Sequence, residues 1–517
     1  MRAIPARVRA DPADPGGGAT ASTGRGLLGR LAAGLRRHWL MVILLAAGLT
    51  LRAATQLAYR PALVYIDSVK YLFGAYPGND PPGYQLVLQA FLKVGTLASV
   101  AVLQHLAGLA MAIVLYLVLC RRGVPNWLAA LATAPLLLDA YQLQIEQSIM
   151  PDTAFEVLIV AGLAVLLWER RPPAALVLAG GLALGASATV RQVGEIFILP
   201  ALLYLLAVVP GWRHKLMQAV LLAVAFALPI LFISYRNYVT IKHFGLAPYA
   251  AGTIYGRTAA AADCGTLSLP RYERALCPTH QQQLLGPDWL DHGAESPIKT
   301  AVPPTGMPHI TFADEFSRQV LIQQPLRVAA AWARDSVKLF ALTRDTAPGD
   351  VTITRWQFQR DYPVYPPYIS LHHGRLQFVR LTPAGKARVI RAGRRYAGRP
   401  AVAPGLASFL RGYQLDGGYP PGPLFLLATV AGLAGCCGLL RRRASAERRA
   451  TAEACLLTMA SAAAVLLASD FFEFSWRYQL PGLVTLPPAG VLGIMVVAGY
   501  IVDRRQSAAA GQPQPAD

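Results

Sequence analysis

The sequence predicts an all-α polytopic membrane protein with about ten transmembrane helices, interfacial helices and a large external loop region. Hydrophobic residues make up 54% of the 517 residues and charged residues only 15%, whereas a soluble globular chain carries about 25% charged residues. The apolar residues gather in runs of about 18 to 24, the length that a helix needs to cross a bilayer. The predicted spans are 39–58, 97–119, 127–140, 152–168, 173–190, 194–210, 216–234, 421–440, 452–469 and 480–502.

Arginine clusters between the spans set the predicted topology. The formal charge is +20, an excess that would suggest a nucleic-acid partner if the chain were soluble. If the ten spans alternate, however, the clusters fall on one side, as expected of cytoplasmic loops. They are Arg36 and Arg37, Arg121 and Arg122, Arg170 and Arg171, Arg213 and Lys215, Arg441 to Arg443 with Arg448 and Arg449, and Arg504 and Arg505. We therefore expect both termini in the cytoplasm and no nucleic-acid partner.

This topology divides the chain into five sections. Residues 1–29 have no apolar period and are predicted to form a disordered cytoplasmic tail, followed by a first span that acts as an uncleaved anchor. The other sections are 30–235 with spans one to seven and the first external loop 59–96, the large external region 236–420, 421–505 with the last three spans, and the cytoplasmic tail 506–517. The bias toward Ala, Arg, Gly and Pro is typical of a bacterial gene of high G+C content, which predicts the plasma membrane.

The two external segments are expected to contain helices. In 59–96, apolar residues from Leu72 to Phe91 suit a helix at the membrane interface, with Pro81 and Pro82 separating it from what precedes. In 311–342, apolar residues at helical spacing predict two short amphipathic helices broken at Pro325. Residues 345–420 give no clear pattern. Cys264 and Cys277 share the external, oxidising region, so we expect a disulfide between them.

Ionisable residues gather at the predicted external ends of the spans. Charge next to the membrane interior is energetically costly, so such residues are candidates for a functional role. The acids are Asp67, Glu146, Asp152, Glu195, Asp470 and Glu473, and the arginines are Arg191, Arg236 and Arg477. Carboxylates beside arginines suit a reaction in which a hydroxyl loses a proton while a phosphate departs, because the acid acts as base and the guanidinium holds the phosphate. A phosphate on a lipid tail would be held at this surface.

Short stretches around these charges resemble a known superfamily. They are Asp67-Ser-x-x-Tyr71 followed by Pro81-Pro-Gly-Tyr, Glu146-Gln-Ser-Ile-Met-Pro-Asp152, Ala-Thr-Val-Arg191-Gln-Val-Gly, Tyr235-Arg236-Asn-Tyr and Trp476-Arg477-Tyr478-Gln-Leu-Pro. The set is similar to the GT-C superfamily of polyprenyl-phosphate-sugar-dependent glycosyltransferases, in particular to bacterial relatives of protein O-mannosyltransferases and aminoarabinose transferases. The resemblance implies a GT-C-like fold and sugar transfer outside the cytoplasm, with Asp67 at the catalytic position. Those mannosyltransferases have an Asp-Glu pair in this loop, whereas here Ser68 follows Asp67.

The predicted enzyme is an inverting glycosyltransferase. Asp67 is the expected base, Glu146 or Asp152 would supply a second acid, and Tyr71 and Tyr478 are expected to contact substrate. The donor phosphate is assigned to Arg191, with Arg236 or Arg477. No spacing demands a metal, although Asp67, Glu146 and Asp152 could bind a divalent cation through oxygen. The partners are a polyprenyl-phosphate-linked sugar, membrane lipids and a glycan, protein or lipid acceptor.

Two other functions fit parts of the sequence. A transporter or flippase of lipid-linked precursors would line a path through the spans with charged residues. Acids and arginines are nearly absent from the middle of the predicted spans, and His105 is the main exception. A non-catalytic envelope scaffold would act through 236–420 and would tolerate the loss of Asp67. Transfer by a membrane enzyme accounts best for the charges on one face.

Overall fold

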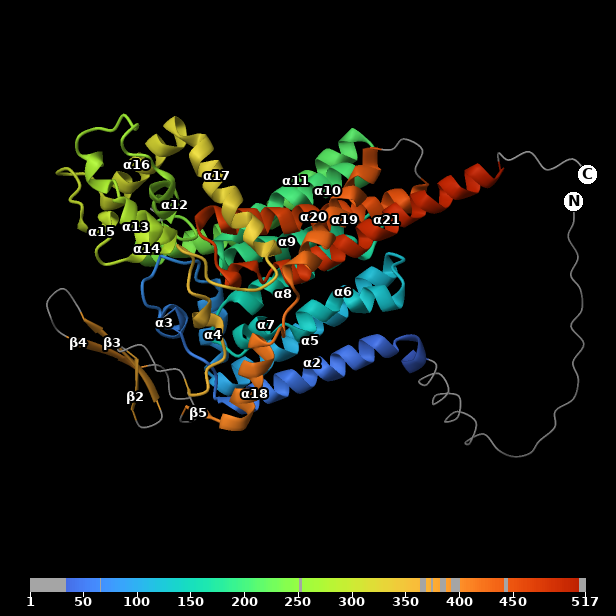
Figure 1. Ribbon diagram of the computed structural model, residues 1–517, viewed down its shortest axis with the longest axis horizontal. Coiled ribbons are helices and arrows are strands. Elements are labelled where there is room, and N and C mark those ends of the chain that lie inside the picture. The colour runs from blue at the N-terminus through green and yellow to red at the C-terminus, as the bar shows by residue number, and fades with distance from the viewer. Residues whose placement is uncertain are drawn as a thin grey trace, which may run out of the picture.

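In the computed structural model, the protein is a helical bundle with short helices and strands at one end (Figure 1). The structure describes residues 34–65, 67–250, 253–362, 369–372, 375–381, 387–391, 400–440 and 445–510. The predicted tail 1–29 and the arginine cluster 441–443 lie outside these residues, as does 511–517 of the second predicted tail.

Each predicted span is helical in the structure. The helices are α2 (Trp39–Ala58), α5 (Leu97–Arg121), α6 (Asn126–Leu138), α8 (Asp152–Trp168), α9 (Ala174–Val190), α10 (Ile198–Val208), α11 (Trp212–Ile241), α19 (Gly422–Cys437), α20 (Ala446–Phe472) and α21 (Gly482–Ala510). Among the described residues, six helices are long and apolar enough to cross a membrane by themselves. A seventh is gained if α6 and α7 (Ala140–Glu146), which meet at a bend of 57°, form one span. The membrane class is thus confirmed, but the count of ten spans is not.

Small residues let the helices of the bundle pack closely, as is common between membrane helices. A Cβ atom at Gly185 of α9 would lie 2.1 Å from the Phe226 carbonyl oxygen of α11, and one at Gly493 of α21 would lie 2.0 Å from the Ala431 carbonyl oxygen of α19. Neither position can take a larger residue without moving a backbone. These contacts hold α9 on α11 and α19 on α21.

One end of the bundle, here called the arginine end, carries most of the described arginine clusters. Arg121 lies 2.6 Å from Glu169 and Arg170 lies 3.8 Å from Glu447. α2 begins and α21 ends on this side, at the right of Figure 1. The described clusters around Arg121 and Arg170, which the sequence predicts for one side, therefore lie at the same end of the molecule.

The opposite end, the loop end, carries the segments 59–96, 236–420 and 470–481. The first contains α3 (Ser68–Phe73) and α4 (Gly83–Phe91), and α4 begins after the two prolines as predicted. The second contains α12 (Thr253–Ala261), α13 (His280–Leu284), α14 (Gly286–His292), α15 (Pro297–Thr300), α16 (His309–Gln323) and α17 (Pro325–Ser336). The predicted pair of amphipathic helices is thus α16 and α17, which meet at Pro325. All of these helices except α13 contribute to a hydrophobic core of their own around Tyr255, Phe312 and Phe316, beside a disulfide between Cys264 and Cys277.

A few short strands occur at the loop end, in a stretch whose sequence shows no clear pattern. Strands β2 (Ile369–His372), β3 (Arg375–Leu381) and β4 (Ala387–Arg391) form an antiparallel sheet at the lower left of Figure 1. Strand β1 (Tyr59–Arg60), directly after α2, pairs with β5 (Ala401–Val402). α18 (Pro404–Leu415) follows β5 and packs on α2. The long region is therefore joined to the start of the first loop.

Candidate functional site

The centre of the loop end is an ion pair between Asp152 and Arg477. Asp152 is the first residue of α8, and Arg477 lies in the short 3-10 helix η6 (Trp476–Gln479) before α21. The guanidinium approaches the carboxylate with two nitrogens, Nε at 2.9 Å from Oδ1 and Nη2 at 2.8 Å from Oδ2. This two-point geometry is the strong form of an Arg–carboxylate pair. Both side chains are almost fully buried.

Arg191 is the second cation on Asp152. It ends α9, and its Nη1 donates to Asp152 Oδ1 at 2.6 Å. Its guanidinium also lies over the ring of Tyr478, 4.7 Å from the ring centre, a favourable cation–π distance. Two arginines therefore share one buried carboxylate.

Asp67 joins the cluster from the first loop. It precedes α3 as its N-cap residue, and its Oδ2 lies 3.3 Å from Arg477 Nη1. Its side chain is 32% exposed, against 2% for Asp152. Burial raises the pKa of the Asp67 carboxyl, but Lys70 and Arg477 more than offset this effect and hold the pKa below its usual value. This direction is opposite to the raised basicity that the sequence neighbours Tyr65 and Tyr71 would by themselves predict for Asp67.

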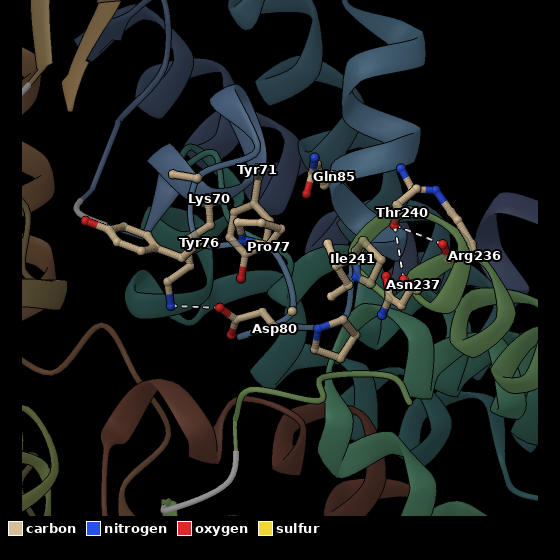
Figure 2. A pocket seen from close by; sticks show the side chains of 14 residues that line it. Lys70, Tyr71, Tyr76, Pro77, Asp80, Gln85, Arg236, Asn237, Thr240 and Ile241 are labelled. Atoms are coloured by element: carbon tan, nitrogen blue, oxygen red, sulfur yellow. Dashed lines mark hydrogen bonds and ion pairs between the residues drawn. The ribbon is translucent and has the colours of Figure 1, made fainter. Parts of the chain in front are cut away.

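Lys70 links Asp67 to Asp80. Its ammonium lies 3.4 Å from Asp67 Oδ1 and 2.9 Å from Asp80 Oδ2, as Figure 2 shows for the second pair. Asp80 stands in the turn-like stretch Gly78-Asn79-Asp80-Pro81, which by itself predicts only local hydrogen bonding, and this ion pair gives its carboxylate a further partner. The signal for Lys70 was available in the sequence, since it follows Asp67 at helical spacing.

Ser68 stands where the resembled mannosyltransferases have a second acid. Its side chain is fully buried, and its hydroxyl donates to the Ile149 carbonyl at 2.9 Å while accepting from the Tyr65 backbone at the same distance. Ser68 thus fastens the first loop to the turn before α8. In this position the chain has a structural hydroxyl in place of a carboxylate.

A pocket of about 130 Å³ lies beside this cluster, between the first loop and the end of α11 (Figure 2). Lys70, Tyr71 and Asp80 line one side, and Arg236 and Asn237 of α11 line the other. Within the part of the chain that the structure describes, Arg236 has no acidic partner. The predicted residues Tyr71 and Arg236 therefore meet in this pocket, whereas Arg191, Arg477 and Tyr478 meet around Asp152.

Glu146 lies in a different environment from the other predicted acids. It ends α7, is fully buried, and accepts from Arg52 at 2.7 Å and from His105 at 2.9 Å. Gln142 also donates to Glu146, at 3.3 Å, and to Glu156 at 2.7 Å. We call the set Arg52, His105, Gln142, Glu146 and Glu156 the inner network. Glu146 does not contact the Asp67, Asp152, Arg191 and Arg477 side chains, which we call the loop-end cluster.

Trp356 and Glu473 complete the surroundings of Arg477 and Tyr478. The ring of Trp356, from the stretch that gave no sequence expectation, lies 5.0 Å from the Arg477 guanidinium. Glu473 follows α20; burial raises its pKa to about 7, with Asp288 adding to the shift and a hydrogen bond to Tyr478 opposing it. No sequence pattern marked Trp356. Glu473 was noted as one of the acids near the last span.

The loop-end cluster does not form a recognisable metal site. Among the described residues, no group of three or more His, Cys, Asp and Glu side chains is arranged to hold a metal ion. The three acids considered for a divalent cation do not meet, because Glu146 belongs to the inner network.

Comparison with known proteins supports the resemblance seen in the sequence. Residues 59–244 match the family model described as dolichyl-phosphate-mannose-protein mannosyltransferase. The match contains Asp67, Asp152, Arg191 and Arg236 but ends before Arg477. No curated protein and no solved structure matches the chain significantly. The match indicates a membrane glycosyltransferase that uses a polyprenyl-phosphate-linked sugar.

Proposed function

We propose, from the match of residues 59–244 to the protein mannosyltransferase family, that this chain transfers a sugar from polyprenyl phosphate to an acceptor hydroxyl at the loop-end cluster. We place that cluster on the extracytoplasmic face of a bacterial plasma membrane and both termini inside, following the arginine clusters. The acceptor is a protein, glycan or lipid of the envelope.

Asp67 is the proposed base. The observation that carries this assignment is its position: it is the carboxylate of the cluster that remains partly exposed, while Asp152 is enclosed by two arginines. In an inverting step, the acceptor oxygen forms a bond to the anomeric carbon opposite the phosphate. The bond from that carbon to the phosphate oxygen breaks, the phosphate keeps the electron pair, and Asp67 takes the hydroxyl proton.

The lowered pKa of Asp67 fits a base that is held ionised until the donor binds. Lys70 and Arg477 lower the pKa of the Asp67 carboxyl. A lipid phosphate nearby would attract the same two cations. Their interaction with Asp67 would then weaken, which raises the pKa of Asp67 toward the range useful for proton transfer. Donor binding and base activation are coupled in this scheme.

The donor phosphate is assigned to the arginines. Arg191 and Arg477 both bind Asp152, Arg477 also lies 3.3 Å from Asp67, and Arg236 contributes a guanidinium with no acidic partner within the described residues. Planar guanidinium groups suit phosphate oxygens. Tyr478, beneath Arg191, and Tyr71, in the pocket, are the proposed contacts to the rest of the substrate.

A transporter remains the alternative because the inner network places charge inside the bundle. Besides His105, this network contains Arg52 and Glu156, which also lie within predicted spans. Arg52, however, is hydrogen-bonded to Glu146 and to the carbonyls of Leu136 and Leu137, as expected of a fixed structural charge.

Purified protein in vesicles, supplied with mannosyl-phosphoryl-polyprenol, tests the proposal. We expect release of polyprenyl phosphate together with a mannosylated envelope acceptor. Movement of the intact lipid-linked sugar between leaflets without cleavage would favour the transporter. If the protein is folded and a cell extract supplies the acceptor, but the lipid-linked sugar is neither cleaved nor moved between leaflets, both activities are contradicted and the scaffold is favoured.

A further inference from the structure

The first loop is fastened to the turn that follows α7. The Leu63 amide donates to the Gln147 carbonyl at 2.9 Å, and the Ile149 amide donates to the Leu63 carbonyl at the same distance. The hydroxyl of Ser68 donates to the Ile149 carbonyl a few residues further along. The backbone on both sides of Asp67 is therefore placed by residues 147–149.

His105 of α5 holds residues 147–149 from inside the bundle. The ring Nε2 lies 2.8 Å from Gln147 Oε1, and Nδ1 lies 2.9 Å from Glu146 Oε2. The amide nitrogen of Gln147 donates to the Tyr59 carbonyl at 2.6 Å, so its oxygen faces His105 as an acceptor. Nε2 of His105 therefore donates to Gln147, and the two ring nitrogens contact two different residues.

Gln104 reinforces the same turn. Its amide nitrogen donates at 2.7 Å to the carbonyls of both Glu146 and Ser148. Gln104, His105 and Gln147 are all buried. Buried polar groups gain most when every partner is satisfied, and such a set then fixes one geometry. The chain of contacts runs from α5 through Gln147 to Leu63 and so to the loop that carries Asp67.

We infer that His105 is a positioning residue, which sets the place of Asp67 through Gln147 and the first loop. It is not a proton carrier and does not touch substrate. The inference rests on the proposed function only for its kinetic consequence, because the placement of the loop is a property of the fold. A displacement of about 1 Å at a reacting group reduces turnover by as much as about 10²-fold.

Two substitutions separate the two contacts of the imidazole ring. His105→Gln places an amide nitrogen near the position of Nε2 and keeps the link to Gln147. His105→Asn places one near Nδ1, keeps the link to Glu146 and loses Gln147. Hydrogen exchange of the backbone segment 62–65 reports loop placement in detergent, and kcat with the donor KM reports its consequence.

We expect His105→Asn to exchange faster at 62–65 and to lose about tenfold in kcat with an unchanged donor KM, while His105→Gln stays close to wild type. If His105→Asn does not accumulate as folded protein, Gln147→Asn, which shortens the same link, takes its place with the same expectation. Equal losses in both histidine variants would overturn the inference in favour of simple packing, and so would unchanged exchange. If the wild-type protein shows no transfer but His105→Asn still exchanges faster at 62–65, the positioning role is supported and the proposed function is refuted.

Discussion

The loop-end cluster and the inner network contain similar side chains but differ in how completely these are enclosed. In the inner network, Glu146 accepts from Arg52, His105 and Gln142 and is fully buried. In the loop-end cluster, Asp67 keeps 32% of its side chain exposed and is held by longer contacts of 3.3 and 3.4 Å. A carboxylate with every oxygen engaged stabilises a fold, whereas one that a substrate can reach is available for chemistry. Four substitutions test this difference.

The largest expected effect is the loss of transfer in Asp67→Asn. An amide cannot accept the hydroxyl proton as a carboxylate does, and general-base catalysis contributes about 10² to 10⁴ in rate. Initial rates in membrane vesicles at matched protein abundance measure it. Asp80 is an unsuitable control, since it shares Lys70 with Asp67. Asp416→Asn, at the exposed end of α18, serves better and should leave the rate unchanged. A wild-type rate in Asp67→Asn would move the base elsewhere in the cluster.

The second effect concerns stability. Glu146→Gln leaves Arg52 buried without its counter-charge, and breaking a buried pair in this way costs about 3 to 5 kcal/mol. Thermal unfolding in detergent should show a large decrease. Glu169→Gln removes the exposed pair with Arg121 and should cost about 0 to 1 kcal/mol. A Glu146→Gln protein as stable as wild type but inactive would return Glu146 to the catalytic role that the sequence suggested.

Arg191→Lys should have a smaller, selective effect. Lysine can still pair with Asp152, but it lacks the planar fork that suits a phosphate and that lies over the ring of Tyr478 here. We expect the donor KM to rise by about tenfold, with unchanged thermal stability. Arg213→Lys at the arginine end is the matched control. Equal donor kinetics in both variants would assign Arg191 to lipid headgroups.

The smallest expected effect is a change in the pH dependence of stability in Glu473→Gln. The folded pKa of about 7 lies above the 4.5 of an ordinary glutamate, so the folded state binds the extra proton between these values. Stability contributed by protonated Glu473 is therefore present at low pH and is lost as pH rises toward 7. Removing the carboxylate should make the midpoint of thermal unfolding depend less on pH between pH 5 and 7. An unaltered slope would show that Glu473 titrates normally.

The sequence predicted the bundle well because apolar runs mark membrane helices directly. It could not settle how many helices span, since α8 and α9 are only 17 residues long and the bend between α6 and α7 leaves no trace in hydropathy. The strands β2 to β4 were missed because the sequence from 345 to 420 shows no clear period. These failures concern geometry that depends on contacts distant in sequence.

The site was predicted in part, for a related reason. Asp152, Arg191 and Arg477 were found because charge at the end of an apolar run is rare. Glu146 was grouped with them since it lies close to Asp152 in sequence, but the turn at 147–151 separates the two carboxylates. Trp356 was not predicted, because its contact with Arg477 depends on how the long region folds back over the bundle.

The contact between Asp67 and Arg477 also has a consequence for biosynthesis. The two residues are 410 positions apart. A ribosome that adds about 5 to 20 residues per second would deliver Arg477 roughly 20 to 80 seconds after Asp67. During this interval the nascent chain carries its proposed base without the arginine that completes the cluster. The activity proposed here would therefore begin only when the last helix has entered the membrane, so a prematurely terminated product would remain inert.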